Sequence, residues 1–253
     1  MSNPLPHDHI LPYGERKQSK KQQVAEMFDQ IAFRYDFLNR FLSGGIDLYW
    51  RRKAISQLKT NKAQKILDVA TGTGDLALAA AKYLKPEQII GVDISKGMLE
   101  LGRKKIEKAH LSDKITLLEA DSEDLPFPDN QFDAVTVAFG VRNFEHLETG
   151  LKEMWRVLKP GGKLVILEFS KPRQAVFSKL YSWYMNKVTP GIGSMISRNR
   201  EAYSYLNESV KAFPEGEALR TILNQCQYEL TEVKPLSFCI ATIYTGQKPK
   251  NLL

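Results

Sequence analysis

A glycine turn with a carboxylate downstream is the part of this sequence best suited to hold a small ligand. Gly72 and Gly74 follow an apolar run, and Asp93 closes the next apolar run, 21 positions after Gly72. Glycines at such a turn let the backbone approach a ligand closely, and the carboxylate can accept hydrogen bonds from a ribose diol. The pattern therefore predicts a binding site for a cofactor that carries adenosine.

Two classes of cofactor fit a turn of this kind. Gly72, Gly74 and Ala77 match the spacing of the dinucleotide-binding turn of NAD-dependent dehydrogenases. However, Asp68 precedes the turn and Asp75 follows it, and carboxylates so placed would repel a pyrophosphate. S-adenosylmethionine has an ammonium and a sulfonium instead, so the acidic flank favours it over NAD. Its carboxylate could be held by free N–H groups where the next helix begins, and Asp68 could reach its ammonium through water.

Two further apolar runs end in polar residues. Asp121 and Ser122 follow one of them, and Arg142 and Asn143 follow the next. Ligands of an open α/β sheet bind beyond the carboxyl ends of its strands, so we expect these residues to meet the glycine turn in one cleft. Asp121 could accept a hydrogen bond from an adenine amino group, and the Ser122 N–H could face a ring nitrogen. Arg142 could bind an oxygen anion, or form a salt bridge with a nearby glutamate.

Apolar runs alternate with helical patterns through the middle of the chain. This alternation predicts an α/β fold with a Rossmann-like, mostly parallel sheet that helices cover on both faces. Ser95 is expected to cap a helix, and the residues 159–162, Lys-Pro-Gly-Gly, are expected to end one. In chain order, strands and helices are predicted alternately over 65–70, 75–84, 88–93, 95–110 and 114–120, followed by a strand over 132–138, a helix over 147–158 and a strand over 163–169.

Segments on either side of this alternation complete one predicted domain, residues 22–253. Helical patterns within 22–62 predict two cap helices, over 22–35 and 48–58, that could cover the binding face. The aromatic-rich residues 173–213 predict a helical insertion before the end of the sheet. A helix over 215–226 and strands over 227–234 and 237–247 bring the predicted sheet to seven strands. Residues 1–21 have little apolar pattern, so we expect a flexible extension there.

Composition narrows the class of protein. The 253 residues include 36 Lys and Arg against 29 Asp and Glu, a mild excess that no nucleic-acid motif accompanies, so no nucleic-acid partner is expected. Cys226 and Cys239 lack metal-ligand spacing, which predicts no metal site and a reduced, cytoplasmic protein. Neither an 18-residue apolar run nor the apolar core of a secretory signal is found, so we expect neither a membrane span nor export.

Motifs outside the glycine turn resemble a known family. They cover 35–50, 139–143, 156–170 and 202–209, together with Phe213-Pro214. On these motifs the chain is similar to the ubiquinone/menaquinone biosynthesis C-methyltransferase family over nearly its full length. The resemblance implies a class I S-adenosylmethionine-dependent methyltransferase fold and a polyprenylated quinol as methyl acceptor. It also implies that the cofactor is contacted by Thr73, Asp93, Asp121 and Ser122.

The chain departs from that family at three positions. Leu38 stands where Met is usual, and Asp47 stands where His is common, so the role of Asp47 stays open. Ala138 replaces a serine that some members have, so no cofactor contact is carried over to this position.

A mechanism can be written with the residues near the cleft. Removing a hydroxyl proton from the quinol makes a ring carbon nucleophilic, and this carbon attacks the sulfonium methyl group. We predict that Arg142 and Asn143 hold the quinol oxygen. Four residues could relay the proton: Tyr35, Asp36, Tyr203 and Tyr205. His146 is a candidate base, although a His at a helix start is more often a surface or capping residue.

Several alternatives for the acceptor and the partners stay open. Demethylmenaquinol is the favoured acceptor, a benzoquinol of ubiquinone biosynthesis is the second, and a non-catalytic scaffold that binds S-adenosylmethionine is the third. The apolar positions of 173–213, flanked by basic residues, could form a groove for the polyprenyl tail and contact the inner face of a membrane. The same positions could instead pack on the sheet or on a second copy of the chain as a homodimer.

Overall fold

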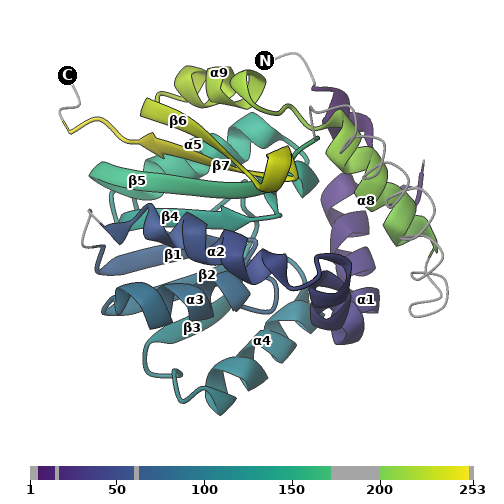
Figure 1. Cartoon of the computed structure of the whole chain (residues 1–253), viewed down its shortest axis with the longest axis horizontal. Helices are drawn as coiled ribbons and strands as arrows, with labels where there is room; N and C mark the ends of the chain where they lie inside the picture. Colours follow the sequence, from purple (N-terminus) through teal and green to yellow (C-terminus); the bar gives the residue numbers. More distant parts are fainter. Residues whose placement is uncertain (1–4, 15–16, 60–62, 172–199, 251–253) are drawn as a thin grey trace.

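A seven-stranded sheet forms the centre of the computed structural model, which describes residues 5–14, 17–59, 63–171 and 200–250, without the side chains of 37–39, 41–42 and 200–203 (Figure 1). The strand order is β3-β2-β1-β4-β5-β7-β6, and only β7 runs against the direction of the other strands, so it pairs antiparallel with both β5 and β6. The strands are β1 (Lys65–Val69), β2 (Gln88–Asp93), β3 (Ile115–Glu119), β4 (Phe132–Ala138), β5 (Leu158–Phe169), β6 (Glu229–Leu236) and β7 (Ala241–Gln247).

Helices cover both faces of this sheet, as the near-continuous apolar strands predicted. On one face, α2 (Ile46–Ser56), α3 (Asp75–Leu84) and α4 (Lys96–Lys108) pack on strand residues such as Ile66. On the other face, α5 (Leu147–Val157) and α9 (Glu217–Gln225) pack on residues such as Leu67. The alternation of Ile66 and Leu67, both fully buried, shows why a parallel central strand needs apolar residues on both sides. The predicted α/β fold class is confirmed.

Most of the predicted elements lie within a few residues of the observed ones. The predicted helix cap is also confirmed, because Ser95 Oγ accepts a hydrogen bond from the Met98 N–H at 3.2 Å. The predicted end of a helix at 159–162 is confirmed, because α5 ends at Val157, but the strand predicted over 163–169 starts earlier, since β5 begins at Leu158. The Pro-Gly-Gly segment is accommodated inside the strand by a register shift against β4 and by a left-handed Gly161 (φ +79°).

The two ends of the predicted domain also differ from expectation. Residues Pro6–His9 form a short 3-10 helix with a buried His7, and α1 (Lys20–Leu42) begins inside the segment that we expected to be a flexible extension. Much of the predicted insertion, residues 172–199, lies outside the described residues. The described remainder of it forms α8 (Arg200–Ala212). None of the helices described here is long and apolar enough to cross a membrane.

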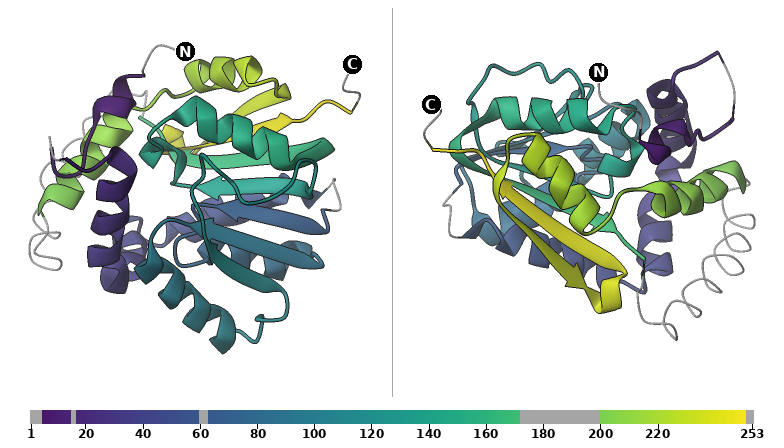
Figure 2. Two further views of the ribbon diagram at one scale, coloured as in Figure 1. Left: turned by 180° about the vertical axis from the view of Figure 1, so that it is seen from behind. Right: turned by 90° about the horizontal axis from the view of Figure 1, so that it is seen from above.

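The chain reverses its direction of winding between β1 and β4, which are neighbours in the sheet. In open α/β sheets a ligand crevice forms where the strand order reverses, beyond the carboxyl ends of the strands. Helix α1 runs along this edge of the sheet, and α8 lies next to it (Figures 1 and 2). The fold therefore places a cover over the crevice in which the predicted site residues should meet.

Candidate active site

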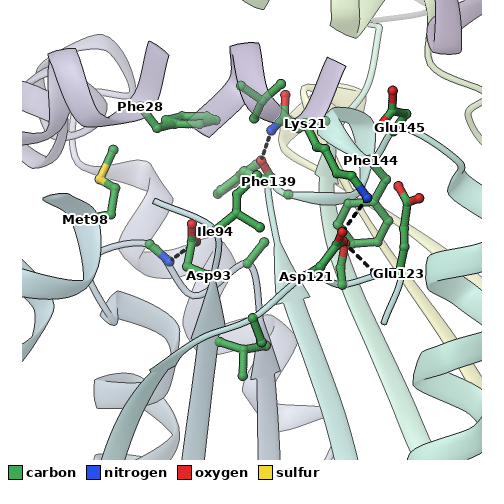
Figure 3. A pocket seen from close by; sticks show the side chains of 18 of the residues that line it. Lys21, Phe28, Asp93, Ile94, Met98, Asp121, Glu123, Phe139, Phe144 and Glu145 are labelled. Atoms are coloured by element: carbon green, nitrogen blue, oxygen red, sulfur yellow. Dashed lines mark hydrogen bonds and ion pairs between the residues drawn. The ribbon is translucent and has the colours of Figure 1, made fainter. Parts of the chain in front are cut away.

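A pocket occupies the crevice between α1 and the ends of β1 to β4, and it holds about 690 Å³ of empty space, part of it open to solvent (Figure 3). The predicted site residues that line the pocket are Tyr35, Gly72, Asp93, Asp121, Ser122 and Asn143. Four strand ends that are distant in sequence therefore converge, as the sequence analysis expected.

Asp93, at the end of β2, ties two loops of the pocket together. Its Oδ2 atom accepts a hydrogen bond from the Gly72 N–H at 2.8 Å, and its Oδ1 atom accepts one from the Ser95 N–H at 2.9 Å. Burial raises the pKa of Asp93, while these N–H donors oppose the rise. Each carboxylate oxygen can accept a second hydrogen bond. Asp93 thus keeps the capacity to accept both hydroxyls of a ribose.

The opposite end of the pocket carries an ion pair. The ammonium of Lys21, on α1, lies 2.7 Å from Oδ2 of Asp121, and Figure 3 shows this side chain reaching down from the helix. This hydrogen bond raises the pKa of Lys21. Among the described residues that line the pocket, Lys21 carries the positive charge, against carboxylates on Asp93, Asp121, Glu123 and Glu145. The balance is acidic, and it suits a ligand with positive charge.

Two carboxylates on α1 bind the loops that follow β1 and β2. Oδ1 of Asp29 accepts hydrogen bonds from Ser95 Oγ (2.6 Å) and from the Gly97 N–H (2.9 Å). Two helical turns further along α1, Asp36 Oδ1 accepts a hydrogen bond from Thr73 Oγ1 at 2.6 Å. Residues seven positions apart lie on the same face of a helix, so the spacing of Asp29 and Asp36 was a signal that sequence reasoning missed.

The start of α1 binds the other two loops. The backbone N–H of Lys20 donates to Glu145 Oε1 at 3.1 Å, and Lys21 pairs with Asp121. Together with Asp29 and Asp36, these contacts join α1 to the loops after all four strands that surround the pocket. Sequence reasoning expected a cap helix over the binding face, but it did not identify Lys21 as a pocket residue.

Three predicted cofactor residues, Asp68, Thr73 and Gly74, lie outside the pocket lining. The buried carboxylate of Asp68 accepts hydrogen bonds from Thr71 Oγ1 (2.6 Å) and Thr136 Oγ1 (2.7 Å), and burial raises its pKa to about 6 despite these donors. Thr73 is 3% exposed and bonded to α1, and Gly74 (φ +78°) precedes α3 in a left-handed conformation. In this structure the three residues shape the glycine turn from behind.

The end of β4 forms the other half of the pocket, and its lining is mainly aromatic, with the carboxylate of Glu145 from the loop that follows. Phe139 lines the pocket in a left-handed backbone conformation (φ +59°), which is rare for a bulky residue. The next residue must be glycine, because a Cβ atom at Gly140 would lie 2.6 Å from the Ala70 Cβ. Asn143 also lines this half, and its Oδ1 accepts a hydrogen bond from the buried Tyr205 hydroxyl at 3.1 Å.

Arg142 lies behind this aromatic wall. It is 4% exposed and is absent from the pocket lining. Its Nη1 atom donates to Glu168 Oε1 at 2.7 Å and to the Phe139 carbonyl oxygen at 2.6 Å. The salt bridge that we considered for Arg142 is therefore present, but with Glu168 on β5 rather than with a glutamate nearby in sequence. A lone acidic residue in an apolar strand was the signal for Glu168.

The remaining predicted catalytic residues belong to three different elements of the fold. Tyr35 lines the pocket from α1, where its ring packs edge-on against Phe28 at 5.7 Å between centroids. The backbone of Tyr203 belongs to α8, but its side chain lies outside the described residues. His146 is exposed at the start of α5. No cluster of three metal-ligand side chains is found in the described part of the chain.

The fold and the pocket together define a methyltransferase of the S-adenosylmethionine-dependent class. Three features of the pocket fit this cofactor. They are the Asp93 carboxylate, which can accept hydrogen bonds from a ribose, the acidic lining, and the glycine turn with open space at Gly72. Solved structures agree at the level of the fold. An S-adenosylmethionine-dependent methyltransferase from Thermotoga maritima is 20% identical with a TM-score of 0.60, over 88% of this chain and 99% of that one. Another, from Aquifex aeolicus, is 18% identical with a TM-score of 0.53, over 73% and 81%.

The chain belongs to the ubiE/COQ5 methyltransferase family, whose model matches residues 16–248. A demethylmenaquinone methyltransferase from Bacteroides fragilis is 48% identical over 96% of this chain and 99% of the relative. A ubiquinone/menaquinone biosynthesis C-methyltransferase from Geobacter sulfurreducens is 47% identical over 92% and 91%. The chain is thus an enzyme, a C-methyltransferase with S-adenosylmethionine as its methyl donor, and the resemblance on which the sequence analysis relied is confirmed.

Proposed function

We propose that the enzyme methylates a ring carbon of a polyprenylated quinol, and that demethylmenaquinol is its acceptor. The observation that carries this proposal is the contrast within the pocket. Its β4 half is lined by Phe139 and Phe144, with Phe28 and Tyr35 above them, and Asn143 is a polar group among them. A flat aromatic ring with one oxygen to be held suits such a wall. The names of the relatives support the same acceptor.

The cofactor half has a separate role. Asp93 accepts hydrogen bonds from the ribose hydroxyls, and Asp121 and Ser122 bind the adenine edge. Thr73, Gly74 and Asp68 hold the turn that brings the Gly72 backbone to the pocket. S-adenosylmethionine, when bound, supplies an electrophilic methyl group. The acidic lining of this half favours its positive charge over a pyrophosphate.

The acceptor half orients the quinol and removes its proton. Asn143 holds a quinol oxygen through its side-chain amide, which the Tyr205 hydroxyl orients from behind. Burial raises the pKa of Tyr205, so its hydroxyl stays protonated and acts as a donor. Tyr35 and Tyr203 relay the quinol proton, and Arg142 contributes positive charge from behind the wall. Because the ring becomes negative as the proton leaves, this charge stabilises the nucleophile.

The acceptor also implies a place of work. A polyprenyl tail resides in the bilayer, so the enzyme contacts the inner face of the membrane transiently to collect its acceptor. The segment to which we assigned this contact, 173–213, falls largely outside the described residues. Homodimer formation through the same segment stays a prediction.

Methyl transfer to a short-chain acceptor tests the proposal. The enzyme is incubated with S-adenosylmethionine and chemically reduced demethylmenaquinone that carries a truncated tail, and mass spectrometry detects the methylated ring. We expect turnover on this naphthoquinol to exceed turnover on a matched benzoquinol by at least about tenfold. A preference for the benzoquinol would select the second acceptor. Cofactor binding by calorimetry without transfer to either quinol would contradict the proposal.

A further inference from the structure

A carboxylate that does not line the pocket is aimed at the pocket wall from behind. Glu168 lies near the end of β5, and its side chain is fully buried (0% exposed). A buried carboxylate is strongly destabilising unless hydrogen bonds and an opposite charge compensate it. All the hydrogen bonds that the structure gives this carboxylate come from Phe169 and Arg142. Its position is therefore tied to the segment that follows β4.

Glu168 binds Arg142 at both its side chain and its backbone. Oε1 accepts from Arg142 Nη1 at 2.7 Å and from the Phe169 N–H at 2.8 Å, and Oε2 lies 3.5 Å from the Arg142 backbone nitrogen. The guanidinium also stacks over the Phe169 ring at 5.4 Å. The residue before Asn143 is thus held at two points, which leaves the short 3-10 turn Val141–Asn143 little freedom.

Arg142 passes this constraint on to Phe139. The same Nη1 atom donates to the Phe139 carbonyl oxygen at 2.6 Å, and the Asn143 side-chain nitrogen lies 3.4 Å from that oxygen. Phe139 has a left-handed backbone (φ +59°), a conformation that persists only when the surroundings hold it. The charge-assisted hydrogen bond from Arg142 to the Phe139 carbonyl oxygen stabilises this conformation. Without it, the Phe139 backbone would be free to relax, and the ring, which also packs on Phe169 and Trp50, would shift in the pocket wall.

We propose that Glu168 is a positioning residue for the methyl acceptor, because through Arg142 it fixes the ring of Phe139 and the amide of Asn143 in the β4 half of the pocket. The inference rests on the proposed function, since it concerns where the quinol ring would sit. It assigns no contact between Glu168 and the substrate. Its consequence is that turnover and acceptor binding depend on Glu168, whereas cofactor binding does not.

The variant E168Q tests this, because glutamine keeps the shape and removes the charge that holds Arg142. We expect kcat to fall by about 10- to 100-fold and KM for the quinol to rise, the fold-change of losing one charged hydrogen bond. The Kd for S-adenosylmethionine, measured by calorimetry, should change by less than about threefold. The matched control is D133N, which removes an ion-paired carboxylate at the opposite end of β4 and should lower Tm without changing kcat.

A second variant keeps the test decisive if E168Q folds poorly. E168D retains the buried charge beside Arg142 but withdraws the carboxylate by one methylene group. Positioning predicts reduced turnover in a folded protein, whereas a role in charge compensation alone predicts wild-type turnover. Wild-type kcat and KM in either variant, or equal losses of cofactor and acceptor binding, would overturn the inference. A wild-type enzyme that methylates no quinol would instead contradict the proposed function.

Discussion

The two halves of the pocket place their charges in opposite ways. At the ends of β2 and β3, Asp93 and Asp121 line the pocket. At the ends of β4 and β5, Arg142 and Glu168 face each other behind a mainly aromatic wall, to which Glu145 also contributes. In the proposed function, the first half binds the cationic cofactor directly, and Arg142 and Glu168 hold the wall against which the acceptor ring lies. The comparison teaches that a charged residue near an active site can bind the ligand itself or can fix the position of the residues that line the pocket.

Helix α1 belongs to both halves. Its Lys21 and Asp29 contact the cofactor side, while Phe28 and Tyr35 cover the pocket. One helix that bridges the two halves can bring donor and acceptor together with little water between them. A reaction that neutralises a negative ring and a positive sulfonium is favoured in such surroundings.

Asp68 offers the largest expected effect, because it is a buried carboxylate like Glu168 but has threonine partners instead of an arginine. Its pKa rises from 3.8 to about 6 on folding, so the folded state binds its proton more tightly. The contribution of this protonated carboxyl to the free energy of unfolding is present below pH 4 and is lost as the pH rises through 6. We expect the free energy of unfolding of the wild type to fall by about 3 kcal/mol across this pH range, and this fall to be absent in D68N, because asparagine does not titrate. Urea unfolding from pH 4 to 7 measures it, and the exposed-site variant D113N should show no change.

Replacing one residue from each half should separate cofactor binding from turnover. D93A removes the acceptor for both ribose hydroxyls, so we expect the Kd for S-adenosylmethionine to rise about 100-fold. N143A removes the group that holds the quinol oxygen, so we expect kcat to fall about 100-fold with little change in that Kd. Calorimetry and initial rates measure the two effects. If both variants lost cofactor affinity equally, the pocket would not be divided as described.

Two glycines sharpen the comparison through stability. In G140A the new Cβ would meet the Ala70 Cβ at 2.6 Å, so we expect a loss of about 2 kcal/mol in the free energy of unfolding. In G72A the Cβ would meet nothing within 4 Å, and only the left-handed backbone (φ +56°) resists it, a loss of about 1 kcal/mol. Urea denaturation measures both. A larger loss for G72A would contradict the view that the β4 half is the more crowded one.

The smallest effect is expected at Lys21, whose ion pair with Asp121 is partly exposed. K21M frees the carboxylate for the adenine amino group, so the Kd for S-adenosylmethionine should fall, but by no more than about threefold. The variant should also bind the cofactor with a stronger dependence on salt concentration, because its pocket lining is more acidic. The general effect of removing a surface lysine is controlled by K96M, whose ion pair with Glu119 lies outside the pocket lining. Weaker binding by K21M would mean that Lys21 supports the cofactor instead.

Local sequence determined much of the scaffold. Apolar runs and helical periodicity gave boundaries close to those of β1 to β4 and α3 to α5, because a strand buried on both faces must be apolar along its length. The convergence of Asp93, Asp121 and Asn143 also followed from sequence, since parallel strands all end at the same edge. The helix end before 159–162 was predicted correctly, whereas the following strand begins earlier than predicted, because Leu158 already pairs with Phe132 of β4.

The direction of individual side chains was decided only by the tertiary structure. Arg142 follows a strand end as Asp93 does, yet it turns away from the pocket, because a left-handed Phe139 and a carboxylate on another strand draw it behind the wall. Likewise, Lys21 enters the pocket because α1 lies across all four loops. Sequence patterns report which residues share an edge or a face. Which of them point into a cavity depends on partners more than 20 positions away, and only packing brings those partners into contact.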